Sequence, residues 1–269
     1  MIRFFTPERG KSAGHWLAEL GIVVAGVLIA LYAQQWASDW QAKKRGAEAE
    51  ERIRNEIFQN SKVQMERIAI HACQRDRLAT IATKIARGDD DWADFAYSLD
   101  STGLWKARRI YRPVSRTYAK DAFEGAIASG SLDVMEPERQ VTLGRLYSQY
   151  AKADAIQQEE YALAARLDSL TVGGPIEPAE KRQLLGTIAL LDRYNGFSTL
   201  MAMQSISRLR DVGMYPTDTQ LREWRKSVAE EDVQLGLINV ARERASYGDC
   251  VDPSGFDFEK QAMTQRSIQ

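Results

Sequence analysis

The sequence predicts an all-α protein, in which an N-terminal transmembrane helix continues into a long stalk helix and then into an antiparallel helical bundle. Three observations predict this class. One apolar stretch near the N-terminus is long enough to cross a bilayer. Apolar residues recur at helical spacing through most of the remaining chain, and no segment shows the alternation typical of a half-buried strand.

The apolar stretch lies between Trp16 and Trp36. A helix rises about 1.5 Å per residue, so these two side chains are about 30 Å apart, which is the thickness of the hydrocarbon core. Together with Trp40, one turn further on, they are placed like the aromatic belt of a membrane span. The stretch is too long for the apolar region of a signal peptide, and no small-x-small cleavage site follows it. We therefore expect a retained anchor.

Glu19 is the one charged residue between Leu17 and Ala33. It lies three residues beyond Trp16, where a carboxylate reaches headgroups or water, so we expect an interfacial role; the alternative is a polar contact between helices. The same stretch holds two small-x-x-x-small pairs, a pattern that lets membrane helices approach closely and associate. These pairs are Gly21 with Ala25 and Gly26 with Ala30.

The chain divides into five segments. In order they are a polar tail (1–12), a transmembrane helix (13–40), a stalk helix (41–88), a helical bundle that packs with the stalk (89–250) and a flexible tail (251–269). Within the bundle, Pro137 and Pro178 suit the first positions of two helices. Thr217 and Gln220 form the pattern of a capping box at the start of another.

Composition and motifs point away from catalysis. Lys plus Arg number 36 and Asp plus Glu 37, a balance that gives no global attraction to nucleic acid. The two histidines, His15 and His71, stand apart, and no zinc, nucleotide-phosphate or Ser-His-Asp pattern is present. We expect no enzymatic activity, no cofactor and no metal. Acidic pairs such as Glu159 and Glu160 are expected on solvated helix faces.

The best candidate for a binding site is a basic segment that has no acidic residue between Asp100 and Asp121. Cations interleaved with aromatic side chains can bind an anionic ligand or an acidic partner. The alternative is that these cations pair within the chain, with the acids at 89–91 and Asp94. The candidate ligand-binding residues are Trp105, Lys106, Arg108, Arg109, Arg112 and Arg116.

The two cysteines, Cys73 and Cys250, allow two interpretations. They form a disulfide in an oxidising compartment, or they are two unrelated buried thiols. Basic residues flank the span on both sides, and a simple count slightly favours a cytoplasmic C-terminal domain. The disulfide interpretation favours the opposite orientation.

Two stretches carry a resemblance to a known family. The first is Trp16-Leu-Ala-Glu19-Leu followed by Val24-Ala-Gly-Val-Leu-Ile-Ala-Leu and Trp36. The second is Ala126-Ile-Ala-Ser-Gly-Ser-Leu132, followed by Pro137 and a helix with Tyr147 and Tyr150. They resemble a family of uncharacterised bacterial single-span membrane proteins. The resemblance implies an inner-membrane anchor and a helical domain outside the cytoplasm, and it favours the Cys73–Cys250 disulfide. It implies no activity.

We therefore expect a bitopic inner-membrane protein whose periplasmic helical domain is an interaction or scaffold module. Its expected partners are the lipid bilayer, a second copy through the transmembrane helix, or another envelope protein, and not nucleic acid. The alternative function is a membrane-anchored sensory or anion-binding domain that uses the basic segment over 105–120.

Overall fold

The computed structural model describes residues 13–92, 97–98, 108–114, 116–229, 247 and 250–264. Its α-helices are α1 (Ala13–Arg87), α2 (Asp121–Ala128), α3 (Pro137–Leu167), α4 (Pro178–Arg208), α5 (Asp218–Ala229) and α7 (Phe258–Thr264). Two 3-10 helices follow α3 and precede α7, namely η1 (Asp168–Val172) and η2 (Pro253–Phe256). The strands β1 (Tyr97–Ser98) and β2 (Arg108–Arg109) form one short antiparallel pair. The predicted all-α class is confirmed.

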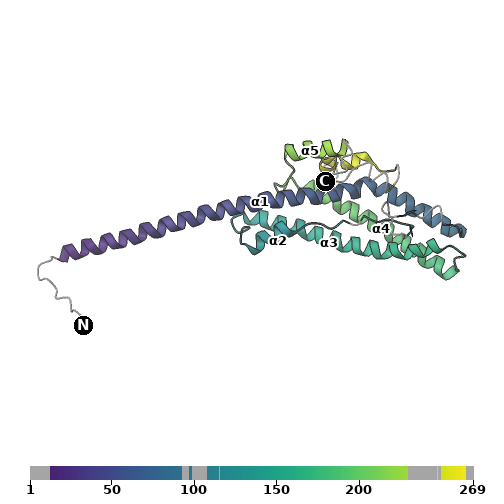
Figure 1. The fold of residues 1–269 in the computed structure, drawn as a ribbon, viewed down its shortest axis with the longest axis horizontal. Coiled ribbons are helices and arrows are strands. Elements are labelled where there is room, and N and C mark those ends of the chain that lie inside the picture. The colour runs from purple at the N-terminus through teal and green to yellow at the C-terminus, as the bar shows by residue number, and fades with distance from the viewer. Residues whose placement is uncertain are drawn as a thin grey trace, which may run out of the picture.

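The first helix, α1, is uninterrupted over 75 residues, or about 110 Å at the ordinary helical rise. It projects far beyond the rest of the molecule on its N-terminal side (Figure 1). The segments predicted as transmembrane helix and stalk thus form one continuous helix. The helix ends before Gly88, whose φ of 80° lies in the left-handed region that glycine adopts without strain.

The surroundings of α1 change at Gly46. No side chain between Trp16 and Arg45 is buried, whereas Gly46 is buried against the turn that precedes α3. A methyl group at Gly46 would overlap the side chain of Val134 in that turn. From Ala49 onward α1 contributes fully buried side chains to the core. One helix is therefore an exposed apolar rod at its start and the spine of a folded domain at its end.

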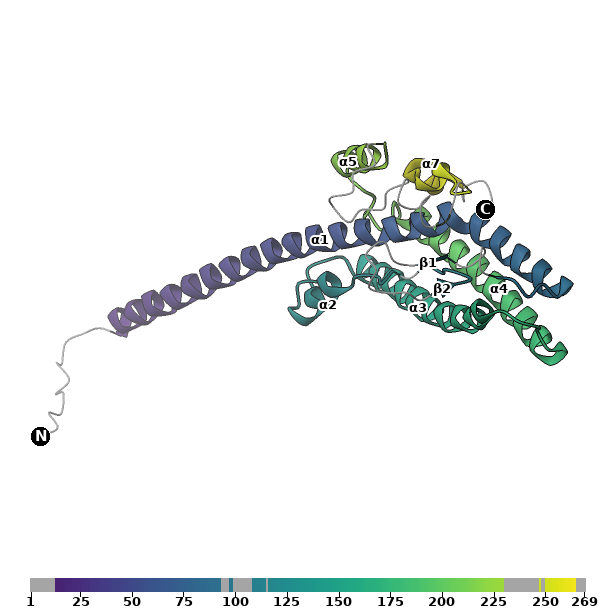
Figure 2. The same cartoon turned by 45° about the vertical axis from the view of Figure 1, so that its right-hand side comes forward.

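The remaining helices pack around this spine. The pairs Glu50–Arg139 and Arg67–Glu160 join α1 to α3 in the same order along both helices, so α3 runs parallel to α1. In contrast, α4 runs antiparallel to both, because Lys181 near the start of α4 donates to the carbonyl of Ala86 near the end of α1, and Asn195 further along α4 donates to that of His71, which comes earlier in α1. The helices α5 and α7 lie on the side of α1 opposite to α2 and α3 (Figure 2). The antiparallel arrangement expected from the sequence therefore holds for α4 but not for α3, which runs parallel to α1.

The parallel course of α3 depends on an extended connection. Residues 110–120, which we call the strap, carry the chain back along the bundle to the start of α2. Serine is a common N-cap residue, so a helix could begin at Ser115, but α2 begins at Asp121. Ser115 itself lies outside the described residues, and the residues around it are extended because side chains of α1 and α3 bind their backbone groups.

Other predicted helix starts match the structure. Pro137 and Pro178 occupy the first turns of α3 and α4. Before α5, the side chain of Thr217 accepts from the N–H of Gln220 at 3.3 Å, and the Gln220 side chain accepts from the N–H of Thr217 at 2.9 Å. This reciprocal pair is the predicted capping box.

The apolar core has two parts with a polar layer between them. The first part surrounds the middle of α1 and includes Ile53, Ile57 and Tyr150. The second lies at the end far from the exposed rod and includes Ile81, Leu167 and Leu191. Between them the helices contribute buried polar side chains instead, namely Gln74 from α1, Gln157 and Glu160 from α3, and Asn195, Ser198 and Thr199 from α4.

The prediction of a flexible tail over 251–269 is wrong for residues 251–264. Val251, Phe256 and Phe258 are 2–3% exposed and belong to the first core. Gly255 lies directly on α1, because a Cβ there would be only 2.6 Å from the backbone nitrogen of Ala69. The error arose because this short segment has no clear helical periodicity of its own, and its apolar residues become buried only against α1, α4 and α5.

Candidate functional site

The predicted basic segment is only partly described by the structure. Trp105 and Lys106 lie outside the described residues. Arg108 and Arg109 form β2, and Tyr97 pairs with Arg109 in the short sheet. The remaining two candidates, Arg112 and Arg116, lie in the strap.

Both of these arginines have partners within the chain. The guanidinium of Arg112 lies 5.4 Å from the centre of the Tyr247 ring. The Nε of Arg116 donates to Glu66 of α1 at 3.0 Å, and Glu66 is itself almost fully buried. The alternative of pairing within the chain thus applies to Arg116, although its partner is Glu66 rather than the acidic run at 89–91.

The strap is an extended segment that lies between α1 and α3. An extended segment inside a helical bundle cannot pair with helix backbones, whose own groups are already bonded, so side chains must satisfy it. Asn60 of α1 does so at Ala119, where its amide both donates to the carbonyl and accepts from the N–H at 2.8 Å. Glu56 accepts from the N–H groups of Ala122 and Phe123 at the start of α2.

The same pattern continues along the strap. From α1, Gln74 donates to the carbonyl of Arg112 at 3.1 Å. From α3, Gln157 accepts from the N–H of Arg116 at 3.0 Å, and Asp154 accepts from the N–H of Tyr118 at 3.2 Å. The polar residues at the centre of both helices therefore have a structural task, which is to hold an extended segment that has no strand partner there.

The most deeply buried charges are Arg67 and Glu160. They form a bidentate pair between α1 and α3, with N–O distances of 2.9 and 2.6 Å, and both side chains are at most 3% exposed. Burial raises the pKa of the Glu160 carboxyl, and the adjacent Arg67 guanidinium acts in the opposite direction. The expectation that Glu160 lies on a solvated face is wrong.

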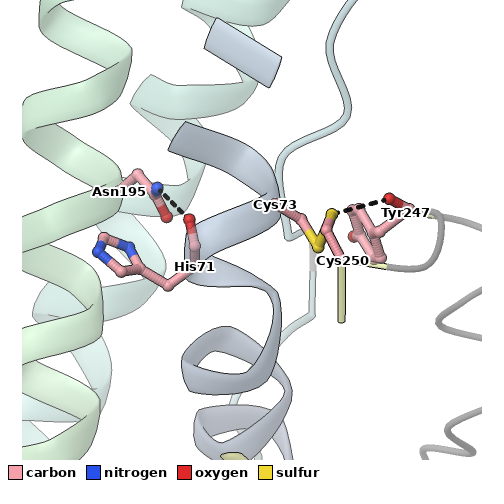
Figure 3. Close-up of a disulfide and its surroundings, with 5 residues drawn as sticks. All are labelled: His71, Cys73, Asn195, Tyr247 and Cys250. Carbon is pink, nitrogen blue, oxygen red and sulfur yellow. Dashed lines mark hydrogen bonds between the residues drawn. A yellow bond between two sulfur atoms is a disulfide. The ribbon is translucent and has the colours of Figure 1, made fainter. Parts of the chain in front are cut away.

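Cys73 and Cys250 form a disulfide, with their Cα atoms 5.1 Å apart. The bond joins α1 to the start of the C-terminal segment (Figure 3). On the opposite side of α1, Asn195 of α4 donates to the carbonyl of His71 at 3.4 Å. Thr199 lies 3.3 Å from the His71 ring, and burial lowers the pKa of this imidazole. His71 and Cys73 therefore face different neighbours, α4 on one side of α1 and the C-terminal segment on the other.

The predicted membrane anchors all lie on the exposed part of α1. Trp16, Trp36 and Trp40 are 60–67% exposed, and Glu19 is exposed as well. Added methyl groups at Gly21 and Gly26 would meet nothing within 4 Å, and Ala25 and Ala30 are exposed on the same stretch. This stretch is the one described helix that is long and apolar enough to cross a membrane.

Within the described residues, no group of three or more His, Cys, Asp or Glu side chains is arranged to hold a metal ion. Two clefts have the size of small-molecule sites. The first, of about 470 Å³, lies between α5 and the η2–α7 segment and includes Trp224 and Phe256 in its lining. The second, of about 440 Å³, lies between α1 and the turn before α3 and includes Lys43 and Glu136.

Comparison of the chain with protein-family models, curated proteins and solved structures finds no match.

Proposed function

We propose that the protein is a single-span inner-membrane protein whose disulfide-closed helical domain lies in the periplasm and serves as an interaction or scaffold module. The observation that carries the proposal is the change in burial along α1. Its first turns are apolar and wholly exposed, and the same helix then becomes the spine of the domain. Exposed apolar surface of this length is unfavourable in water and favourable in a bilayer.

The alternatives for an apolar helix fit this observation less well. A core helix of a soluble domain would be buried by its neighbours, and none of the apolar window of α1 is. A cleaved signal sequence would be separated from the domain at an accessible site, whereas α1 continues as a helix from Trp36 to the buried Ile53 without a break. A retained span is the remaining reading.

The disulfide supports the periplasmic orientation. Structural disulfides persist in oxidising compartments and are rare in the cytosol. The Cys73–Cys250 bond links residues 177 positions apart and fixes the C-terminal segment on α1. In a reducing compartment this segment would be held by its noncovalent contacts alone, which include the hydrogen bond from the N–H of Asp252 to the carbonyl of Ala69. The count of flanking basic residues points the other way, but long domains translocate largely regardless of such charges.

An apolar stripe on α4 supports the interaction module. Leu190, Phe197 and Leu200 are 42–51% exposed, and their spacing places them on one face of the helix. Large exposed apolar groups that share a face are typical of protein contact surfaces. The anion-binding alternative lacks such support, because Arg116 is already paired with Glu66.

Reporter fusions test the proposal. Alkaline phosphatase fused after Gln269 is expected to be active, because this enzyme folds only in an oxidising compartment, and green fluorescent protein exported through the same pathway at that position is expected to be dark. A matched pair of fusions directly after Arg45 should give the same result, because α1 crosses the membrane once. Fluorescence together with inactive phosphatase at both positions would place the domain in the cytoplasm and refute the proposal.

A further inference from the structure

The second cleft described above opens at the end of the domain that faces the membrane span. It is lined by Lys43, Gly46, Ala47 and Glu50 of α1 and by Val134, Met135, Glu136 and Arg139 around the start of α3. Lys43 lies three residues, or about 4.5 Å, beyond Trp40, so the cleft begins one turn outside the aromatic belt. Its position brings it within reach of lipid headgroups.

The charged side chains of the cleft lie at different distances from the membrane. Glu50 is paired with both Arg54 and Arg139, at 3.0 and 2.7 Å, so it has no free charge for a ligand. Lys43 has no partner among the described residues and is exposed, as is Glu136. Arg139 also lines the cleft, but both of its terminal nitrogens donate to Glu50, so Lys43 and Glu136 are the cation and the anion that remain unpaired there among the described residues.

Glu136 lies further from the bilayer than Lys43. Its neighbour Val134 packs against Gly46, and Arg139 bonds to Glu50, so Glu136 lies level with the turn of α1 between these two contacts. That turn begins three residues after Lys43, about 4.5 Å further out. A ligand in the cleft therefore meets a cation first and an acid second as it extends away from the membrane.

We propose that this cleft binds the headgroup of a phosphatidylethanolamine-type phospholipid, with Lys43 at the phosphate and Glu136 at the primary ammonium. In such a lipid the phosphate lies nearer the hydrocarbon core and the ammonium lies outside it, which is the order of the two side chains. The exposed Ile127 and Val134, 55% and 45% exposed at the same end of the domain, supply apolar contacts at the membrane surface. The proposal assumes the membrane span of the proposed function.

Native mass spectrometry of the full chain in non-ionic detergent tests this assignment. The protein is titrated with equal amounts of phosphatidylethanolamine, phosphatidylcholine and phosphatidylglycerol, and the retained fraction of each is measured. We expect preferential retention of phosphatidylethanolamine. Glu136→Gln should lower its retention about fivefold, the upper range for an exposed ion pair, and leave phosphatidylglycerol unchanged. Lys43→Gln should lower the retention of every phosphate-containing lipid.

Two neighbouring substitutions are matched controls, because Lys44 and Glu138 do not line the cleft. Lys44→Gln and Glu138→Gln should leave the retained fractions at the wild-type level, and millimolar inorganic phosphate should not displace the lipid. Equal retention of the ethanolamine and choline lipids, or a Lys43→Gln variant that behaves like Lys44→Gln, would overturn the proposal. Preferential retention of phosphatidylglycerol that is insensitive to Glu136→Gln would overturn the ammonium assignment.

These outcomes are separable from those of the topology experiment. A cytoplasmic C-terminal domain would refute the periplasmic function, but it would not alter lipid selectivity measured in detergent. Loss of that selectivity in a correctly oriented protein would refute the headgroup site alone.

Discussion

The side chain of Asn60 donates to the carbonyl of Ala119 and accepts from the N–H of the same residue, both at 2.8 Å. It thus makes the two hydrogen bonds that a neighbouring β-strand would make. This pairing shows how the bundle incorporates an extended strap between two helices. Every side chain that binds the strap backbone replaces a hydrogen bond that a sheet would have supplied. The arrangement makes these polar residues part of the fold rather than part of a ligand site.

Asn60→Leu is expected to destabilise the domain by about 1–3 kcal/mol, because leucine keeps the branched shape of the side chain but cannot make the two hydrogen bonds to the backbone of Ala119. Denaturant unfolding of the full chain in detergent, followed by circular dichroism, measures the change. Gln59→Leu is the matched control, since Gln59 is exposed, and it should change stability by less than about 0.5 kcal/mol. Equal effects of the two variants would show that the strap does not depend on Asn60.

Glu160→Gln is expected to cost about 3–5 kcal/mol, because it leaves the Arg67 charge buried without a counter-charge. The double variant Arg67→Met with Glu160→Leu should be far less destabilised than the sum of the single variants. Asp192→Asn tests a surface pair for comparison. Asp192 lies 3.7 Å from Arg75 with both side chains more than half exposed, and its loss should cost less than about 1 kcal/mol. Additive effects of the buried pair would contradict this account.

Gly255→Ala should detach the C-terminal segment from α1, because its methyl group would overlap the backbone of Ala69. The expected result is a lower Tm and faster limited proteolysis after residue 250. Gly125→Ala is the opposite case, since nothing lies within 4 Å of a methyl group there and α2 is helical at this position. That variant should be stabilised by about 0.5–1 kcal/mol. A Gly255→Ala variant as stable as the wild type would refute the close contact.

Lys62 gives a prediction for alkaline pH. Its side chain is 7% exposed and its Nζ lies 4.6 Å from the centre of the Phe58 ring, and burial lowers its pKa from 10.5 to about 8. Because the unfolded chain binds this proton more tightly, stability should rise as the pH increases from about 8 towards 10.5. The measurement is Tm as a function of pH. The rise in Tm between about pH 8 and 10.5 should be smaller in Lys62→Met than in the wild type, and it should be unchanged in the exposed control Lys152→Met.

The sequence predicted those features that depend on local composition. The exposed apolar part of α1 follows from a run of apolar residues between tryptophans, and the starts of α3 and α4 follow from Pro137 and Pro178. The continuous helix through residue 87 follows from the absence of any stop signal before Gly88. None of these features requires knowledge of a distant residue.

Features that depend on distant partners were not predictable in this way. Glu160 and its exposed neighbour Glu159 are the same residue type, and only Arg67, 93 positions away, distinguishes them. The strap likewise depends on Asn60, whose polar position on a core face was visible only as an irregularity in the apolar pattern. Polar residues that interrupt an otherwise apolar helix face, such as Asn60 and Gln74, were the available signal for an extended segment beside it.

The central claim is that the domain lies on the oxidising side of the membrane with Cys73 bonded to Cys250. Thiol trapping tests it most directly. Bacterial cells that express the full chain are precipitated with acid and denatured in the presence of a maleimide-polyethylene glycol, with and without prior reduction, and the gel shift is read by immunoblot. The account predicts no added mass without reductant and two added polymers with it. Two added polymers without reductant would show that both thiols are free in the cell and would contradict the account.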